Sequence, residues 1–341
     1  MLLLLACTGR PTVAIVGGGP AGLAAAIEAA PHADVLLYEG EDELGGSARW
    51  AMGVTATELP GDGAAARYRD QVESEVLAWT TSLGVTWQPV PDPHGSQELQ
   101  APAGGGRALV DALVREAQAR GVTLQTGRRI GTLAELPRVD AVIVATGGVM
   151  GDVERFRAWA GLPDGELLRG APTFADGNGW DLIDGALMTE PNYLLYAHGT
   201  PGPGDAALMV VAAEGLTTRE GELLEGPRGD QGSRWAAEPR ERWLDLPETH
   251  RVGLLDWQAG QTRPATGSLK LVPTTAKTLS GVTTDEGGRV LGKHGPLPRI
   301  YAAGEVSGFG NAYAAGAADS TMVAGAILTG RTAARTALED L

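Results

Sequence analysis

The stretch TVAIVGGGPAGLAAAIEAAPHADVLLYE, residues 12–39, places a glycine-rich turn and an alanine-rich segment between two short apolar runs. The first run, Val13–Val16, has the length and β-branched content of a buried parallel strand, and Val35–Tyr38 is a second apolar run of the same length. The alanine-rich segment from about Pro20 to Ala30 predicts a helix. Together they predict a βαβ unit, the starting piece of a Rossmann-like parallel sheet.

The turn after the first run has the spacing G-x-G-x-x-G at Gly17, Gly19 and Gly22. The first glycine permits a tight turn, the second lets backbone approach a pyrophosphate, and the third lets the helix pack close to the strand. The helix start then offers unpaired N–H groups to phosphates. Glu39, about 20 positions further on, is placed to accept hydrogen bonds from a ribose diol. Because the chain has 50 glycines, the alternative is a turn without a ligand, but the surrounding strands, helix and acid favour dinucleotide binding.

Length and composition limit the classes of protein to consider. The chain has 341 residues, of which 43% are hydrophobic and 20% charged, as expected for a globular protein with two lobes. Its net charge of −15 argues against nucleic acid as a partner. No apolar run approaches the ~20 residues that span a bilayer, so no transmembrane span is predicted. The five histidines are scattered and Cys7 is the single cysteine, so we expect no metal site and no intrachain disulfide.

The residue pattern changes twice along the chain. Strand and helix patterns alternate up to residue 148, clean periodicity falls between residues 149 and 264, and the alternation of strands and helices then resumes. We predict an α/β fold in which residues 11–148 and 265–341 form one Rossmann-like domain, with a mostly parallel sheet and helices on both faces. Residues 149–264 would form a smaller inserted α+β domain that caps the substrate site. Within these parts, Glu238–Leu244 and about Ala315–Leu338 are predicted to be helical.

The first residues, MLLLLACTGR, have two interpretations. Leu4-Leu5-Ala6-Cys7 resembles the cleavage box of a bacterial lipoprotein signal, but the charged and full-length apolar parts of a signal are missing. The alternative is an apolar tail that leads into the first strand. We therefore predict a cytoplasmic protein, with lipid anchoring in the cell envelope through Cys7 as the alternative.

Several separated motifs together resemble one family. They are VGGGPAGL with Glu39, GGSA at residues 45–48, GGGRALVDAL from residue 104, VIVATGG ending at residue 148, and IYAAGEVSG from residue 300. Their order is similar to that of the flavoprotein subunits of the succinate dehydrogenase and fumarate reductase family, including its 3-ketosteroid dehydrogenase relatives. The resemblance covers both ends of the chain and implies that FAD is the cofactor. Covalent attachment through histidine is not expected, because no histidine lies near residues 45–52.

The resemblance assigns the cofactor site residue by residue. The glycine turn and Glu39 would hold the ADP half, Gly45 to Ser47 would lie beside the pyrophosphate and flavin, and Glu305 would bind the ribityl chain. Trp50 would either flank the flavin or lie in the core. The expected FAD-binding residues are Gly17, Gly19, Pro20, Ala21, Gly22, Glu39, Gly45, Gly46, Ser47, Ala145, Thr146, Gly147, Gly304, Glu305 and Ala315.

The substrate-binding elements of the family are only partly matched. Arg242, Arg263, Lys277 and Tyr313 are the candidates for anion binding or proton transfer, and Lys277 stands where the family has a substrate-binding histidine. Each has a plain structural alternative, such as a solvated arginine, a lysine on a turn or a tyrosine in the core. Loss of the histidine and of one or two arginines argues against C4-dicarboxylates as substrates.

These inferences predict an oxidoreductase that moves a hydride between flavin N5 and a C=C or CH–CH unit next to a carbonyl or carboxylate. Its partners would be a small-molecule substrate and an electron donor or acceptor protein. One alternative is a catalytically degenerate flavin-binding protein, such as a redox sensor. Another is an envelope lipoprotein that passes electrons to a partner.

Overall fold

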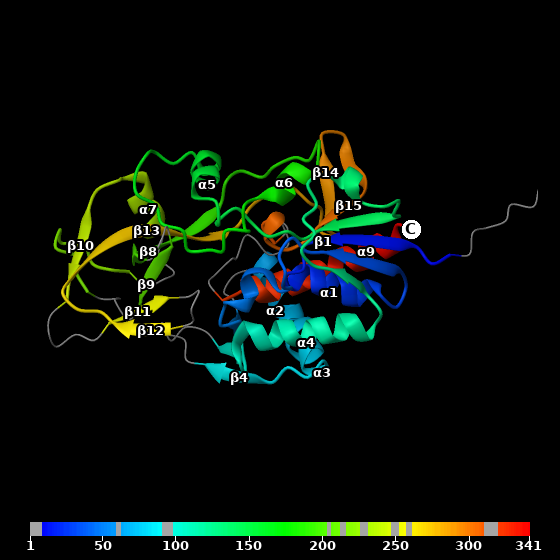
Figure 1. The fold of residues 1–341 in the computed structure, drawn as a ribbon, viewed down its shortest axis with the longest axis horizontal. Helices are drawn as coiled ribbons and strands as arrows, with labels where there is room; N and C mark the ends of the chain where they lie inside the picture. Colours follow the sequence, from blue (N-terminus) through cyan, green and yellow to red (C-terminus); the bar gives the residue numbers. More distant parts are fainter. Residues whose placement is uncertain are drawn as a thin grey trace, which may run out of the picture.

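A computed structural model describes residues 9–58, 63–90, 98–202, 206–211, 216–225, 231–246, 252–256, 261–309 and 320–341. The chain forms two lobes that lie side by side, each built on a six-stranded sheet (Figure 1). A third, smaller sheet belongs to the first lobe. The predicted mixed α/β fold with a mostly parallel sheet is confirmed.

The first lobe is built on strands from both ends of the chain. Its sheet has the order β14 (Arg289–Gly292), β15 (Gly295–Ala302), β7 (Ala141–Val144), β1 (Thr12–Val16), β2 (Asp34–Tyr38) and β6 (Thr123–Gln125). The five strands from β15 to β6 are parallel, and β14 is antiparallel to β15. Because parallel strands are covered on both faces, β1 after Thr12 and all of β7 are apolar, as their sequences predicted.

Helices cover one face of this sheet. They are α1 (Pro20–Ala29), α4 (Gly105–Ala119) and α9 (Met322–Glu339), and they share a core with the sheet. The opposite face is covered by the short helix α6 (Asn178–Leu182) and by η3 (Leu133–Glu135) with the loops around them. Figure 1 shows α1, α4 and α9 on one side of β1 and α6 on the other.

Smaller elements complete the first lobe. A helical stretch runs through α2 (Ala64–Gln71), η2 (Val72–Ala78) and α3 (Trp79–Ser82), and its middle part is a π-helix. The remaining elements are η1 (Gly46–Arg49), η4 (Gly304–Val306) and the small sheet of β3 (Thr55–Ala56), β5 (Leu99–Pro102) and β4 (Trp87–Val90).

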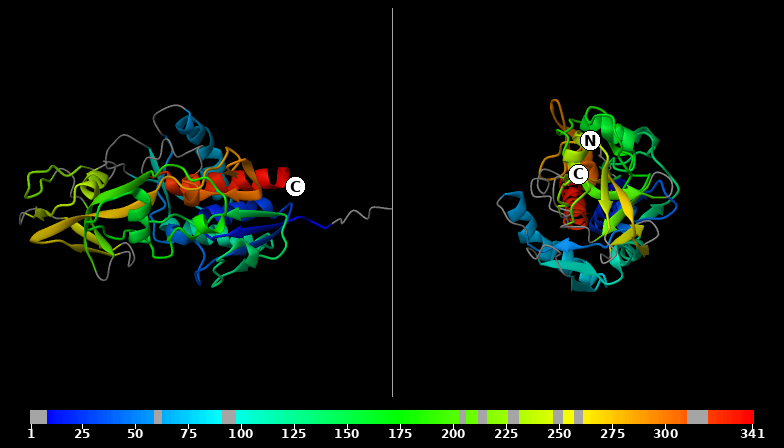
Figure 2. Two further views of the ribbon diagram at one scale, coloured as in Figure 1. Left: turned by 90° about the horizontal axis from the view of Figure 1, so that it is seen from above. Right: turned by 90° about the vertical axis from the view of Figure 1, so that its left-hand side faces the viewer.

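The second lobe is an antiparallel sheet with the order β10 (Arg242–Asp245), β13 (Ser268–Thr278), β8 (Tyr193–Pro201), β9 (Ala207–Val211), β11 (Gly253–Asp256) and β12 (Gln261–Pro264). Helix α7 (Gln231–Ala237) packs on β8, and α5 (Val153–Ala160) lies between the lobes. Because β13 belongs to this sheet, we propose that the chain returns to the first lobe after Thr278, later than the predicted residue 264. Figure 2 shows the second lobe and the C-terminus at opposite ends of the molecule.

Two predicted helices differ from the structure. The helix expected over Glu238–Leu244 is wrong, because α7 ends before Pro239 and residues 242–245 form strand β10. Burial alternates along β10, with Arg242 and Leu244 buried, which fits a strand rather than a helix. Helix α9 begins at Met322, since Ser320 has φ of 71° and cannot belong to a continuous right-handed helix with it, while residues 315–319 of the predicted helix lie outside the described residues.

A network of charged side chains joins α9 to the rest of the first lobe. Glu28 on α1 accepts hydrogen bonds from the Nε atoms of Arg331 at 2.8 Å and Arg335 at 2.7 Å. Arg335 also donates to Glu75 at 2.8 Å, and the Arg331 guanidinium lies 4.4 Å from the centre of the Trp79 ring. Burial disfavours the charged form of Glu28, but the bonds from Arg335 and Arg331 outweigh it, so the pKa of Glu28 is lowered from its usual value of 4.5.

We expect Glu28→Gln to lower the free energy of unfolding by about 1–3 kcal/mol near neutral pH, because two arginines lose their charged partner. A lowered folded-state pKa contributes stability above the unfolded value, and this contribution is lost as the pH falls through the folded value. The difference between wild type and variant should therefore shrink below about pH 4.5 in urea unfolding. Glu73→Gln, at an exposed position of η2, is the control. An equal deficit at acidic and neutral pH would contradict the assignment.

Candidate functional site

A cleft of about 440 Å³ opens outside the carboxyl ends of the parallel strands. The residues that follow these strands line it: Gly17 after β1, Glu39 after β2, Ala145 after β7 and Gly304 after β15. In parallel α/β sheets this edge is where ligands bind, because the loops after successive strands meet there. The cleft continues past the first lobe and is closed on its far side by residues of the second lobe.

Backbone contacts that exclude side chains shape the turn between β1 and α1. Gly17 has φ of 107°, and a Cβ there would lie 2.3 Å from the Ala145 oxygen. A Cβ on Gly22 would lie 1.8 Å from the Gly17 oxygen, so the helix can start this close to the strand only with glycine. Gly19 differs, since its missing Cβ would meet nothing within 4 Å and would stand at the cleft. The turn is therefore closed towards the protein and open towards the cleft.

Glu39 is held in place by backbone N–H groups. Its Oε2 accepts a hydrogen bond from the Gly18 nitrogen at 2.8 Å, and its Oε1 accepts one from the Glu41 nitrogen at 2.9 Å. Each carboxylate oxygen can accept a second bond, so the group keeps acceptor capacity at the cleft. On the same side, the Arg128 guanidinium lies 5.2 Å from the centre of the Tyr38 ring, and both residues line the cleft.

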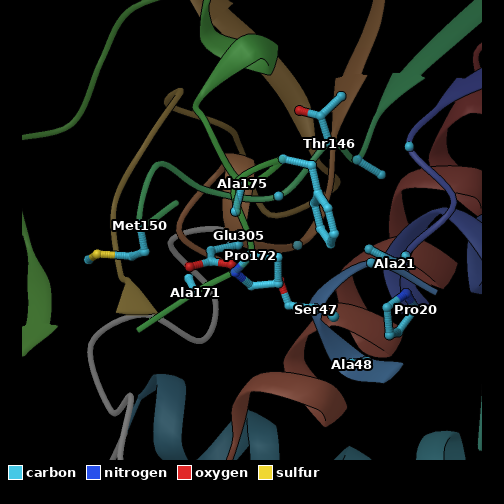
Figure 3. A pocket seen from close by; sticks show the side chains of 18 of the residues that line it. Pro20, Ala21, Ser47, Ala48, Thr146, Met150, Ala171, Pro172, Ala175 and Glu305 are labelled. Atoms are coloured by element: carbon cyan, nitrogen blue, oxygen red, sulfur yellow. The ribbon is translucent and has the colours of Figure 1, made fainter. Parts of the chain in front are cut away.

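A second glycine turn packs directly against the first. The Gly45 nitrogen donates to the Gly18 oxygen at 2.8 Å, and a Cβ on Gly46 would lie 3.3 Å from the Gly19 Cα. The turn leads into η1, which presents Ser47 to the cleft (Figure 3). The two turns therefore form one wall made almost entirely of backbone.

The chain returns to the same place near its C-terminal end. A Cβ on Gly304 would lie 2.9 Å from the Ala21 Cβ at the start of α1. Beside it, Glu305 Oε1 accepts a hydrogen bond from the Thr278 nitrogen at 2.8 Å. Burial raises the pKa of Glu305 from its usual value, although the bond from Thr278 and the charge of Lys277 oppose this. Figure 3 shows Glu305 between Met150 and the residues of the α1 start.

The second lobe supplies an apolar wall with one cation. Tyr196 from β8, Met209 from β9 and Leu255 from β11 line the cleft there. Lys277 from β13 joins them and is half-buried. Of the described residues that line the cleft, Lys277 is the one basic side chain from the second lobe, whereas the lining arginines, Arg128 and Arg129, follow β6.

The loop between the lobes is fixed to β13. The Thr275 hydroxyl donates to the Met150 oxygen at 2.7 Å and accepts from the Gly170 nitrogen at 3.0 Å. The Thr278 hydroxyl accepts from the Val149 nitrogen at 3.1 Å. These bonds place residues 149–150 and 170–175 at the cleft, between the glycine turns and the second-lobe wall.

Most of the residues predicted from sequence meet in this one cleft. Those that line it are Gly17, Gly19, Pro20, Ala21, Glu39, Gly46, Ser47, Ala145, Thr146, Gly147, Lys277, Gly304 and Glu305. Gly22 and Gly45 lie behind the lining and shape it through the close contacts described above. Tyr313 and Ala315 lie outside the described residues. Gly304 and Glu305 thus meet the Gly17 turn, as a single extended cofactor requires.

Two predicted arginines do not line the cleft. Arg242 is 2% exposed, donates from Nε to Glu222 at 2.9 Å and lies 4.4 Å from the centre of the Trp235 ring. Burial, followed by the charge of Arg240, lowers the pKa of Arg242 from its usual value. Arg263 lies on the exposed strand β12. Neither arginine is among the described residues that line the cleft, and Arg242 is packed within the second lobe.

Sequence reasoning missed the apolar part of the cleft. Met150, Phe174, Tyr196 and Met209 come from loops and strands that carry no motif. Strand alternation could have indicated which side of β8 or β9 faces inwards, but not which strand lies beside the cleft. Trp50 also lines the cleft and is 42% exposed, so it is not a core residue.

Metal binding and membrane crossing find no support in the described residues. Within those ranges, no group of three or more His, Cys, Asp and Glu side chains is placed to hold a metal ion. No helix in the same part of the chain is both long and apolar enough to cross a bilayer.

The cleft fits an anionic dinucleotide. Helix α1 begins at the cleft with Pro20 in its first turn and no acidic residue there, so its remaining unpaired N–H groups and dipole favour phosphate. The backbone wall at Gly19 and Gly46 leaves the room that side chains would fill. Glu39 adds an acceptor at one end. Fold and site together define a dinucleotide-binding α/β protein with a second lobe over its cleft.

The chain belongs to the FAD binding domain family, whose sequence profile matches residues 12–89 and 184–319. FAD is therefore its cofactor, as predicted. A KsdD-like steroid dehydrogenase of Mycobacterium tuberculosis is 46% identical over 86 residues, which are 24% of this chain and 15% of the relative. The aligned part thus spans only a small share of that relative's length.

Solved structures share the fold over nearly the whole chain. The open conformation of a flavocytochrome c3 fumarate reductase has a TM-score of 0.72 at 16% identity, covering 98% of this chain and 79% of its own. 3-Ketosteroid Δ1-dehydrogenase from Sterolibacterium denitrificans has a TM-score of 0.73 at 12% identity, with 97% and 100% covered. 3-Ketosteroid-Δ4-(5α)-dehydrogenase from Rhodococcus jostii RHA1 has a TM-score of 0.64 at 17% identity, with 98% of each chain covered.

Two glycines of the first turn should respond differently to alanine. Gly22→Ala places a Cβ against the Gly17 oxygen and should lower the free energy of unfolding by about 3 kcal/mol or more. Gly19→Ala has open space and a φ of −73°, so the cofactor-free protein should melt within about 2 °C of wild type. Its affinity for FAD should fall about tenfold, because the new methyl stands at the cleft. Thermal unfolding and FAD titration measure both effects. A Gly19→Ala protein with unchanged FAD affinity would contradict the placement of the cofactor.

Proposed function

We propose that this protein is an FAD-dependent oxidoreductase that moves a hydride between flavin N5 and a C=C or CH–CH unit adjacent to a carbonyl or carboxylate. The observation that carries the proposal is the continuity of the cleft. It runs from the glycine turns at Gly17 and Gly46 to an apolar second-lobe wall with Lys277. One end is suited to a nucleotide and the other to a small organic substrate, and residues of both ends line the same cleft.

FAD, when bound, supplies the hydride acceptor or donor, and the residues of this chain supply position and charge. The start of α1 and the backbone wall at Gly19 would hold the pyrophosphate, and Glu39 the ribose. Glu305 would hold the chain between pyrophosphate and flavin. No described histidine lines the cleft, so we propose noncovalent binding.

Lys277 is our candidate for contact with the substrate oxygen. The residue is half-buried in a mostly apolar wall, where a positive charge stabilises negative charge on an oxygen more strongly than in water. Hydride addition to a C=C next to a carbonyl places negative charge on that oxygen, and removal of the α-proton does the same in the reverse direction. Arg242, Arg263 and Tyr313 stay proposals for anion binding or proton transfer.

The lining favours an apolar substrate with one polar end. A C4-dicarboxylate needs cations at both ends, and among the described residues the second lobe contributes one. Of the three solved structures described above, two are named as 3-ketosteroid dehydrogenases and one as a fumarate reductase. We propose that ketones and enones are better substrates than dicarboxylates.

A flavin-binding protein without turnover is the second candidate. It is favoured by the position of Arg242, which is engaged with Glu222 and Trp235 away from the cleft, and by the exposed position of Arg263. In this case the second-lobe wall would shield the flavin rather than receive a substrate.

Cofactor binding is tested first. The purified protein should show the visible absorbance bands of flavin, and added FAD should raise its melting temperature. The bands should be lost with the soluble fraction after denaturation, as expected for noncovalent binding. A protein with neither bands nor a thermal shift would end the proposal.

Turnover is tested separately. The FAD-loaded protein is photoreduced without oxygen and mixed with 4-androstene-3,17-dione, 1,4-androstadiene-3,17-dione, a small enone or fumarate. Reoxidation by at least one enone would support the oxidoreductase, and the rate should be higher than with fumarate. Reoxidation by none of the four would support the flavin-binding protein without turnover.

Lys277→Met should lower kcat/KM for the best substrate about ten- to a hundredfold, because the developing negative charge loses its cation. FAD content should stay the same. Lys293→Met is the matched control, since Lys293 is exposed in the turn between β14 and β15. An unchanged kcat/KM in Lys277→Met would remove Lys277 from the mechanism.

For location and partners, we propose a cytoplasmic protein with a small-molecule substrate and an electron donor or acceptor protein. The alternative is a lipid anchor at Cys7, which lies outside the described residues. Mass spectrometry of the native N-terminus distinguishes them, because an unmodified Met1 rules out the anchor.

A further inference from the structure

An exposed tryptophan stands at the rim of the cleft. The Trp50 side chain lines the cleft, yet 42% of it is exposed, and Met52 beside it is 69% exposed. Large apolar side chains that lie open next to a cavity are typical of binding surfaces, because a ligand covers them when it enters. Trp50 and Met52 thus lie exposed at the cleft rather than elsewhere on the surface.

The backbone under Trp50 is fixed. The Trp50 nitrogen donates to the Ser47 oxygen at 3.3 Å, and the Ala51 nitrogen donates to the Ala48 oxygen at 3.2 Å. The Gly106 nitrogen at the start of α4 donates to the Ala51 oxygen at 2.9 Å. These hydrogen bonds therefore hold the backbone of Trp50 in place at the end of η1.

A second aromatic ring faces Trp50 from another part of the chain. The Phe174 ring centre lies 5.6 Å from the Trp50 ring centre, with 37° between the ring planes. Its loop is held by bonds from the Ala175 nitrogen to Pro172 at 3.0 Å and from the Gly151 nitrogen to Ala175 at 2.7 Å. Phe174 also lines the cleft, so the two rings form a continuous aromatic surface between η1 and the loop that connects the lobes.

We propose that Trp50 and Phe174 form the outer wall of the substrate end and select substrates with a flat, extended apolar body. This inference rests on the proposed function. Two rings at this distance present more than about 100 Å² of apolar area between them, and aromatic faces favour flat partners. A small substrate would engage only Lys277 and the deeper wall. A larger ring system would reach the rim and cover the tryptophan. Trp50 thus acts on substrate size rather than on the chemical step.

The test compares a large and a small ketone. Binding of 4-androstene-3,17-dione and of cyclohex-2-enone to the FAD-loaded protein is measured by flavin difference spectra and by calorimetry. For Trp50→Ala, the Kd of the steroid should rise at least about tenfold, while that of the small enone should change less than about twofold. Trp50→Phe should recover most of the steroid affinity, because it restores a flat ring.

Two controls separate substrate recognition from other roles. Leu187→Ala removes a side chain that is 45% exposed and does not line the cleft, so it should leave both affinities unchanged. FAD content and melting temperature should be the same in Trp50→Ala as in wild type. Loss of FAD from Trp50→Ala would assign the ring to the cofactor and overturn the inference, as would equal losses for both ketones or no loss for either.

The outcomes also separate this inference from the proposed function. If the wild type is reoxidised by the small enone but does not bind the steroid, the oxidoreductase stands and the size-selecting wall is refuted. If photoreduced wild type is reoxidised by none of the compounds used to test turnover and binds neither ketone, both proposals fall together. If Trp50→Ala loses steroid binding alone and keeps its reoxidation rate with the small enone, the wall is supported.

Discussion

The close approach of α1 to the first sheet is the constraint on which the rest of the structure depends. A Cβ at Gly22 would lie 1.8 Å from the Gly17 oxygen, and a Cβ at Gly17 would lie 2.3 Å from the Ala145 oxygen. Helix α1 and the ends of β1 and β7 can therefore approach one another this closely only because glycines occupy positions 17 and 22. Because they meet, the start of α1 points into the cleft and the second glycine turn can pack on the first. The C-terminal helix follows the same rule, since Gly330 lets α9 lie against the Ala21 backbone.

This constraint explains why the cofactor half of the site could be predicted from the sequence. A backbone wall is visible in the sequence as glycines at fixed spacings. Glu39 follows β2 directly, and Glu305 comes three residues after the end of β15. The second lobe shows no such pattern. Its wall consists of single side chains such as Tyr196 and Met209, spaced by antiparallel pairing, and many apolar residues would serve in their place. The strand β10 was mistaken for a helix because four alternating residues carry too little periodicity to distinguish the two.

Arg242 illustrates the limit of motif similarity. Its neighbourhood resembles a family element, but its guanidinium is satisfied by Glu222 and stacked near Trp235 inside the second lobe. A buried arginine without partners would be very costly, so the same residue pattern that suggests a catalytic group also arises from the need to pair a buried charge. Distance to the cleft decides between the two, and a sequence does not contain it. Lys277 had an equally weak sequence signal and lies at the cleft.

The strand that connects the lobes also fixes the position of Lys277. Strand β13 belongs to the second sheet, yet its last residues bond outside it: Thr275 bonds to Met150 in the loop between the lobes, and the Thr278 nitrogen bonds to Glu305 in the first lobe. Lys277 lies between these two residues, so its backbone is fixed relative to both lobes. A cation that must meet a substrate oxygen above a cofactor held by the first lobe needs this kind of double attachment. The strand that joins the lobes is therefore a place in the second lobe where a residue can be positioned against the first.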